Sequence, residues 1–180
     1  LEHFQIPFQE VLVPFDDFRA DQAFKETISK VSPTAKVPTL LNDNMRIWDS
    51  LAICEYLAER FPEKYLWPND FRQRARARSM CAEMHGSFMA LRSLCGMNID
   101  ADLTNIGAKL WQDNLKLQRD VQRIEQLWSE RPSTDSFLCS DQFSIVDTFY
   151  APVVMRFVGY GIPISSFSQQ YVQKILAVPA

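Results

Sequence analysis

The stretch from residue 32 to residue 57 constrains the fold of this chain more than any other segment. Val37-Pro38 precedes a short apolar run, a tight polar turn follows at 42–44, and Asp49-Ser50 then opens a segment with apolar residues on one helical face. Apolar runs on both sides of a polar turn are typical of a β-hairpin, and an acidic residue followed by serine is typical of a helix start. The order predicts a hairpin that leads directly into a helix over about 50–60.

This arrangement suits an extended peptide as ligand. Because proline has no N–H for a sheet ladder, the Val37 backbone at the strand edge can pair with a peptide as an added strand would. At a helix start, unsatisfied N–H groups and a partial positive charge favour a carboxylate, which Ser50 can hold with its hydroxyl and amide. Asp49 would neutralise an ammonium on the same ligand, and a γ-glutamyl group carries both charges on one carbon. The alternative for Asp49-Ser50 is an ordinary helix cap.

Lys36 immediately precedes this site. Its ammonium is a point charge that can bind a further carboxylate, such as the glycine carboxylate of a tripeptide. The alternative is a solvated lysine on a loop.

Composition excludes several classes of protein. The chain has 180 residues with a net charge of −3, which gives no electrostatic footprint for nucleic acid. The arginines of the Arg72–Arg78 segment alternate, so on a helix they spread around more than one face; we expect a solvated face or a subunit contact there. No apolar run approaches the ~20 residues that span a membrane.

The four cysteines point to a cytoplasmic protein with reduced thiols. None of them forms a Cys-x-x-Cys pair, and neither histidine lies at metal-ligand spacing from a cysteine. We therefore expect no metal. Cys54 falls on the apolar stripe of the helix over 50–60 with Leu51 and Leu57, so we do not expect it to be a nucleophile.

The chain divides into two parts by pattern. We expect a first domain at 1–64, with a strand at 8–13, a loop at 14–20 and a helix at 21–30. The Tyr65–Asp70 segment reads as the linker, and helical patterning dominates the second domain at 65–180.

The second part predicts a helical bundle. Helices are expected at about 69–94, at 103–128 with one gap in the apolar pattern at Asp113/Asn114, and from about Ser168. Ser144 and Asp147 have the spacing of a capping box. The segment after it, 148–158, is apolar nearly all round and predicts a central helix.

A pocket is one interpretation of the segment that contains Met84, His85 and Phe88. Gly86 in the same segment lowers helix stability by ~1 kcal/mol relative to alanine, so it suggests a close approach of another element. Helix–helix packing is the alternative for all of these residues.

Taken together, Val37-Pro38, Asp49-Ser50, the helix that follows and the Ser144–Asp147 capping box resemble the soluble glutathione S-transferase family. The stretch Cys81-Ala82-Glu83-Met84-His85 is similar to a bacterial subgroup, from which this chain departs in having Gly86-Ser87 where the subgroup has Ser-Gly. The resemblance implies an α/β thioredoxin-like N-terminal domain and an all-α helical-bundle C-terminal domain. It also implies a cis Val37–Pro38 bond, and glutathione as co-substrate, bound by Lys36, Val37, Asp49 and Ser50.

The resemblance further implies a homodimer whose small electrophilic substrate sits between the domains, near Met84, His85 and Phe88. In the family the catalytic Ser, Tyr or Cys lies at the end of a first strand. We expect that strand and most of its helix to be absent from this chain, because too few residues precede 8–13 to supply them. No catalytic residue is therefore assigned.

Three functions remain open on the same scaffold. The first is glutathione transferase. The second is a glutathione-dependent cis-trans isomerase of the maleylacetoacetate type. The third is a non-catalytic protein-binding adaptor of the stringent-starvation type, against which the retained Asp49-Ser50 pair argues, since an adaptor needs no γ-glutamyl site.

Overall fold

The structure is a computed structural model that describes residues 1–14 and 22–179. It divides into an N-terminal unit, Leu1–Leu66, and a helical unit, Trp67–Pro179. The division falls inside the segment that we interpreted as a linker. Residues 15–20 of the expected loop and residue 21 of the expected helix lie outside the described residues.

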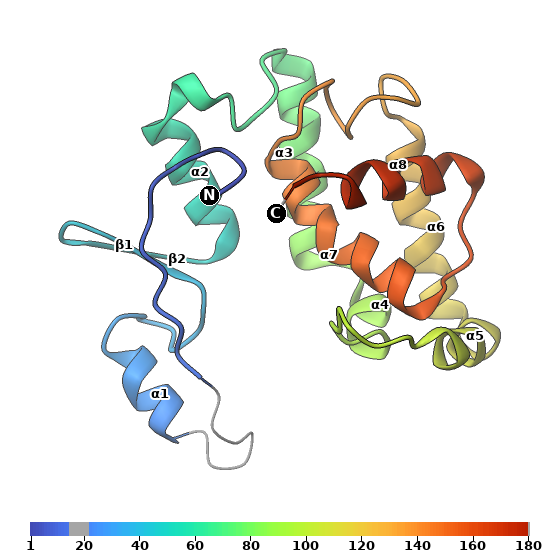
Figure 1. The fold of residues 1–180 in the computed structure, drawn as a ribbon, viewed down its shortest axis with the longest axis horizontal. Helices are drawn as coiled ribbons and strands as arrows, with labels where there is room; N and C mark the ends of the chain where they lie inside the picture. Colours follow the sequence, from blue (N-terminus) through green and yellow to red (C-terminus); the bar gives the residue numbers. More distant parts are fainter. Residues whose placement is uncertain (15–21, 180) are drawn as a thin grey trace. The chain divides into compact units, whose positions relative to one another are not determined.

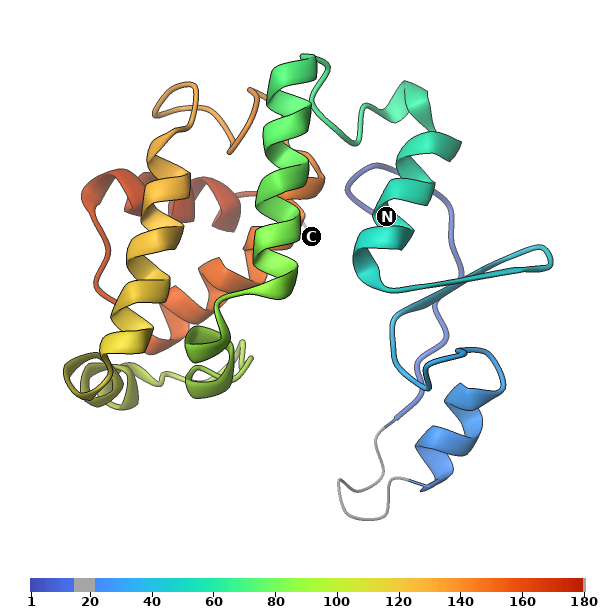
Figure 2. The same cartoon turned by 180° about the vertical axis from the view of Figure 1, so that it is seen from behind.

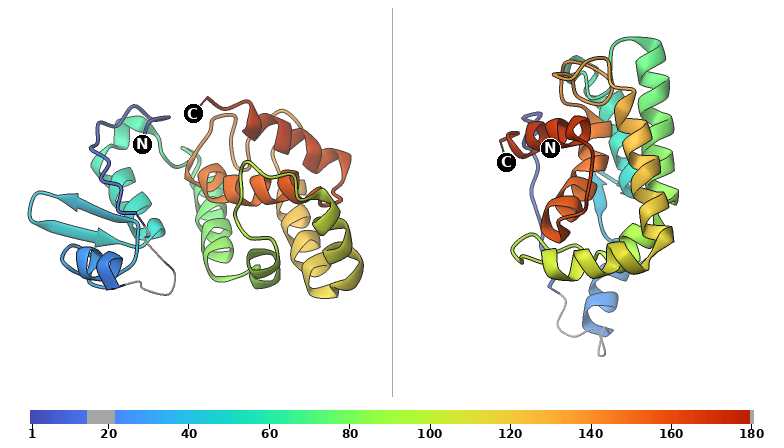
Figure 3. Two further views of the ribbon diagram at one scale, coloured as in Figure 1. Left: turned by 60° about the horizontal axis from the view of Figure 1, so that its bottom comes forward. Right: turned by 90° about the vertical axis from the view of Figure 1, so that its right-hand side faces the viewer.

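The N-terminal unit contains α1 (Gln22–Ser29), the antiparallel strands β1 (Thr39–Asn42) and β2 (Met45–Trp48), α2 (Ser50–Arg60) and a short 3₁₀ helix at Pro62–Lys64, as Figure 1 shows. The predicted hairpin and the helix after it are confirmed. Figure 3 shows the two strands crossing the unit beside α2. The Asn42 amide donates to the Tyr56 hydroxyl and so ties β1 to α2.

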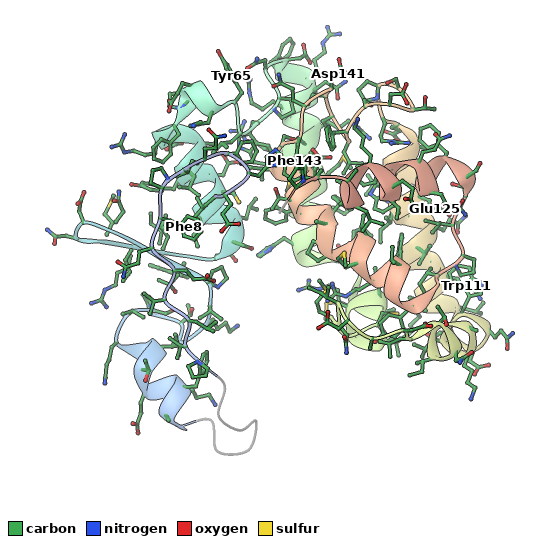
Figure 4. All side chains as sticks on the ribbon, in the orientation of Figure 1. Phe8, Tyr65, Trp111, Glu125, Asp141 and Phe143 are labelled. Atoms are coloured by element: carbon green, nitrogen blue, oxygen red, sulfur yellow. The ribbon has the colours of Figure 1, made fainter. Side chains whose placement is uncertain are left out.

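The strand predicted at 8–13 is wrong. These residues have no regular secondary structure, and the side chains of Val11 and Leu12 are 76% and 83% exposed. A strand is held by hydrogen bonds to a neighbouring strand. Within the described residues β1 and β2 pair only with each other, so this segment has no ladder. Phe8, drawn in Figure 4, is likewise 46% exposed.

The helical unit contains α3 (Phe71–Gly86), α4 (Met89–Leu94), α5 (Thr104–Asp113), α6 (Leu115–Ser129), α7 (Ile145–Tyr160) and α8 (Ser166–Leu176). Figure 2 shows α3 and α6 in front of α7, and α7 packs against α3, α5 and α8. The predicted central position of α7 is confirmed, because eight of its residues are buried. Glu125 of α6 accepts a hydrogen bond from the Ser165 amide at the start of α8 (Figure 4).

Two of the predicted helices are each broken in two. The first stops at Gly86 and resumes after Phe88, which adopts a left-handed conformation with φ 57° and ψ 41°. The second breaks at Asn114, whose extended backbone ends α5 and begins α6. The gap in the apolar pattern at Asp113/Asn114 was the signal for the second break.

The predicted capping box of α7 forms around Ser144 and Asp147. One oxygen of the buried Asp147 carboxylate accepts from the Ser144 amide at 3.0 Å and from the Ser144 hydroxyl at 3.1 Å. The other oxygen accepts from the Leu138 amide at 3.0 Å and from the Tyr171 hydroxyl at 3.1 Å. Asp147 thus also joins α7 to α8 and to the loop that precedes α7.

Candidate functional site

The strand register brings the two halves of the predicted peptide site to one end of the hairpin. Thr39 pairs directly with Trp48, and such partners lie about 5 Å apart in an antiparallel ladder. Val37 lies two residues before Thr39 and Ser50 two residues after Trp48. Both therefore leave the hairpin at the same end, which sequence spacing alone could not establish.

Val37 presents an unpaired backbone at this end. The Val37–Pro38 bond is cis, as the resemblance implied. The side chain of Val37 is 53% exposed. Within residues 1–14 and 22–179, neither its N–H nor its C=O makes a hydrogen bond. An exposed, unpaired backbone segment is what an added peptide strand requires.

Asp49 is the N-cap of α2, so the capping interpretation applies to it. Its Oδ1 accepts from the Leu51 amide at 2.9 Å and from the Ala52 amide at 3.4 Å, and its carbonyl accepts from the Ile53 amide. These capping bonds do not include the amide or hydroxyl of Ser50. Ser50 is therefore the group at this helix start that can meet a ligand carboxylate.

The backbone of Asp49 is strained. Its φ of 74° and ψ of 128° lie where a residue with a side chain is held at a cost of about 1–3 kcal/mol, and such residues cluster at functional sites. The strain lies directly between Trp48 of the hairpin and Ser50 of the helix. It fixes the direction in which the chain enters α2.

Lys36 lies next to this site and is exposed. Its amide donates to the Ser32 hydroxyl at 3.4 Å, and its carbonyl accepts from the Thr39 hydroxyl at 3.2 Å. The backbone of Lys36 is thus anchored to the loop on one side and to β1 on the other, while its ammonium lies at the surface.

The pocket candidates of the helical unit differ in exposure. Met84 and Phe88 are buried at 9% and 4% exposure, so they contribute to the packing of this unit. His85 is exposed, and its ring meets the edge of Phe149 on α7 with ring centroids 6.4 Å apart. The close approach expected at Gly86 is wrong, because a Cβ there would have no atom within 4 Å.

The thiols do not offer a nucleophile. All four cysteines are free, and three are buried. Burial raises the pKa of Cys54 to about 11 and that of Cys139 to about 11, so both stay protonated at neutral pH. Cys54 is only half-buried, which differs from the buried stripe expected for α2.

The described residues hold no group of three or more His, Cys, Asp or Glu side chains that could bind a metal ion. In the same part of the chain, no helix has both the length and the apolar character that crossing a bilayer requires. One arginine of the Arg72–Arg78 segment has a role in packing, since Arg76 donates to the Leu138 and Leu127 carbonyls inside the helical unit.

Comparison with known proteins identifies the class. A family model for the glutathione S-transferase N-terminal domain matches residues 1–60. A glutathione transferase homologue from Burkholderia, solved with bound glutathione, is 27% identical with a TM-score of 0.56, over 85% of this chain and 72% of that one. A homologue from Sulfitobacter, 19% identical, has the same fold with a TM-score of 0.70, over 98% of this chain and 84% of that one.

Curated relatives have several functions. Glutathione S-transferase 1 of Dianthus caryophyllus is 26% identical over 153 residues, 84% of this chain and 68% of that protein. A stringent starvation protein A homologue of Pasteurella multocida is 23% identical over 156 residues, 87% of this chain and 68% of that protein. A probable maleylacetoacetate isomerase of Caenorhabditis elegans is 37% identical over 78 residues, 43% of this chain and 36% of that protein.

The fold is therefore that of the glutathione S-transferases, a thioredoxin-like N-terminal region with few strands followed by an all-helical domain. Residues 1–60 match the glutathione S-transferase N-terminal domain, and the chain as a whole resembles glutathione S-transferases in sequence and fold.

Proposed function

We propose that the N-terminal unit binds glutathione and that the protein directs the glutathione thiolate at a small electrophile, as a glutathione transferase. The observation that carries the proposal is the unpaired, exposed backbone of Val37 at the same end of the hairpin as the Ser50 amide and hydroxyl. An extended peptide with a carboxylate at one end fits these two features together.

Each part of glutathione has a partner in this proposal. The cysteinyl backbone pairs with Val37 as an added strand. The γ-glutamyl carboxylate meets Ser50 at the start of α2, and the γ-glutamyl ammonium meets the Asp49 carboxylate, which has two oxygens and can cap the helix as well. Lys36 binds the glycine carboxylate as a point charge.

The chemistry requires the thiolate form. A free thiol titrates near ~8.5, so a shift of about two pKa units, worth ~2.7 kcal/mol, makes it predominantly anionic at neutral pH. The thiolate then forms a C–S bond with the electrophile as the leaving group departs. We assign this stabilisation of the thiolate to no residue of the chain.

Calorimetric titration with glutathione tests the proposal on the intact protein. We expect a dissociation constant in the micromolar-to-millimolar range, weakened roughly tenfold by Ser50→Ala and by Asp49→Asn. Asn retains capping ability and tolerates a positive φ, so D49N removes the charge while α2 keeps its cap.

The chain offers matched controls in the helical unit. Asp70 caps α3 through a 2.9 Å bond from the Gln73 amide, and Ser166 is the first residue of α8. D70N and S166A should leave glutathione affinity unchanged. Absence of binding by the intact protein would contradict the glutathione site and favour the adaptor. Binding by S50A and D49N that is as tight as that of wild type would do the same.

Glutathione-dependent isomerisation is the second candidate, because the relative with the highest identity of the three is a probable maleylacetoacetate isomerase. Consumption of glutathione separates the two activities. A transferase consumes one thiol for each conjugate formed, for example with chlorodinitrobenzene, whereas an isomerase returns the thiol after each turnover of maleylacetoacetate.

We also propose a homodimer located in the cytoplasm. The four free thiols support a reducing compartment. Light scattering on the eluting protein should give about twice the 20.8 kDa of one chain, and a mass of one chain would contradict the dimer.

A further inference from the structure

The turn that precedes Lys36 is held by a single buried serine. Ser32 is 1% exposed, and its amide donates to the Ile28 carbonyl of α1 at 2.7 Å. Its carbonyl accepts from the Ala35 amide at 3.1 Å, and its hydroxyl accepts from the Lys36 amide at 3.4 Å. The same hydroxyl lies 3.3 Å from the Thr34 hydroxyl. Ser32 therefore connects the last turn of α1 to the backbone of Lys36.

The backbone directly before Lys36 is strained. Ala35 has a φ of 51°, in the left-handed region that residues with a side chain rarely adopt. The same is true of Asp49, whose φ is 74° and which directly precedes Ser50. Each residue to which we assign a carboxylate of the ligand thus follows a residue with a positive φ. Such conformations persist only where the surrounding structure holds them, and at Ala35 the hydrogen bonds of Ser32 on either side of the strained residue do so.

Lys36 is fixed through its backbone, whereas its charge is not used inside the described chain. Its carbonyl accepts from the Thr39 hydroxyl at the start of β1, at 3.2 Å. Its side chain is exposed, and within residues 1–14 and 22–179 its ammonium forms no ion pair. A fixed backbone limits the positions that the long lysine side chain samples, so less conformational freedom is lost when the ammonium meets a carboxylate.

We propose that Ser32 is a positioning residue of the glutathione site, which holds Lys36 where its ammonium distinguishes a tripeptide with a free C-terminal carboxylate from one with a neutral C-terminus. Because Ser32 is buried, it acts through Lys36 and does not itself touch the ligand. The inference rests on the proposed function, since the carboxylate is that of the glutathione glycine. It goes further in assigning selectivity at this end of the ligand to a hydroxyl outside the contact residues.

Glutathione and glutathione amide are the two probes. In the amide, a neutral carboxamide of nearly the same shape replaces the glycine carboxylate. An ion pair at an exposed lysine contributes modestly, so calorimetric titration of the intact protein should show glutathione binding roughly fivefold more tightly than the amide. The ratio of the two affinities should fall at high ionic strength, because salt screens an exposed pair.

Substitutions test whether Ser32 acts through Lys36. Lys36→Gln should bring the affinity ratio to roughly one. Ser32→Ala should lower the ratio at least roughly twofold through weaker glutathione binding, with the affinity for the amide unchanged. In the double variant the serine change should not alter the ratio further, since residues that act as a unit are not additive.

Ser29→Ala is the matched control. The Ser29 hydroxyl donates to the Glu26 carbonyl at 3.0 Å, at the end of the same helix, and is not bonded to Lys36. This variant should leave both affinities unchanged. Ser32→Cys, which keeps the size of the side chain but replaces the hydroxyl by a weak acceptor, should lower the ratio as S32A does and keeps the test valid if S32A does not fold.

A purely structural role for Ser32 predicts a different result. A loosened turn would weaken the binding of both probes equally and leave their ratio unchanged, and that result would overturn the inference while the proposed function stands. An affinity ratio near one in the intact protein would do the same. Absence of glutathione binding by the intact protein would overturn the proposed function and this inference with it.

Discussion

Asp147 is the residue whose ionisation matters most inside the helical unit. Its carboxylate is fully buried and accepts four hydrogen bonds, from Leu138, Tyr171 and both donors of Ser144. Burial raises the pKa of Asp147 to about 6, against the opposing effect of these bonds. The folded state therefore binds a proton at this carboxyl more tightly than the unfolded state does.

This pKa makes stability depend on pH in a defined window. The stabilisation from the raised pKa is fully present below the unfolded value near ~3.9 and is lost as pH rises through about 6. A shift of about two units corresponds to roughly 3 kcal/mol. Urea unfolding of wild type and Asp147→Asn should show wild type losing about that much stability relative to D147N between pH 4 and pH 7.

The sign distinguishes this prediction from a simple buried ion pair. A carboxylate whose pKa were depressed in the folded state would make wild type gain stability over D147N in the same window, and that result would contradict our assignment. Asp141, which is exposed in the preceding loop, provides the control, because D141N retains Asp147 and should follow the pH dependence of wild type.

The sequence predicted one half of the hydrogen-bond cluster around Asp147 and not the other half. The spacing of Ser144 and Asp147 is local and is sufficient to predict a capping box. Tyr171 and Leu138 reach the same carboxylate from positions 24 and 9 residues away, and no local pattern marks them. The same holds for Ser50 and Val37, whose meeting at one end of the hairpin follows from the strand register rather than from their spacing.

At the scale of elements, α5 and α7 cross closely at Gly107. A Cβ on Gly107 would lie 1.8 Å from the Tyr160 carbonyl oxygen and 2.7 Å from its carbon. Both are backbone atoms, so a side-chain rotation cannot relieve the clash. The Leu103 amide donates to the Gly159 carbonyl at 2.9 Å beside this crossing, which further restricts movement.

We expect Gly107→Ala to destabilise the helical unit by about 3 kcal/mol or more, because the two helices must separate. Gly86→Ala is the control within the same unit. Since a Cβ at Gly86 meets nothing within 4 Å, that change should be neutral or stabilising by up to ~1 kcal/mol. Thermal unfolding followed by circular dichroism measures both, and equal midpoints for the two variants would contradict the close crossing.

The helix breaks show where element-level prediction stops. At Asp113/Asn114 the apolar pattern lapses, so the break there had a visible signal. At Phe88 it had none, because a phenylalanine in the left-handed region is uncommon and is held there by its burial at 4% exposure. The strand expected at 8–13 failed for another reason, since apolar residues form a strand only where a neighbouring strand can pair with them.

At the scale of the whole molecule, the two units differ in the extent of their cores. Among the described residues of the N-terminal unit, the buried apolar side chains are Ile6, Phe24, Ile28 and Leu66, and α2 has no buried residue. The helical unit buries large side chains on α3, α6, α7 and α8, with Trp128, Tyr150 and Tyr171 at 0% exposure. Burial of apolar surface is the main favourable term in folding, so the N-terminal unit is the less stable of the two.

We therefore expect the intact chain to unfold in two steps, the N-terminal unit first. Hydrogen exchange should be faster for amides of α1 and α2 than for those of α6 and α7, and glutathione should protect the first group by mass action. Ile28→Ala in α1 and Ile124→Ala in α6 form a matched pair, at 3% and 0% exposure. Each should cost about 2–5 kcal/mol, I28A in the first step alone and I124A in the second. A single transition, lowered equally by both variants, would mean that the units fold as one cooperative body.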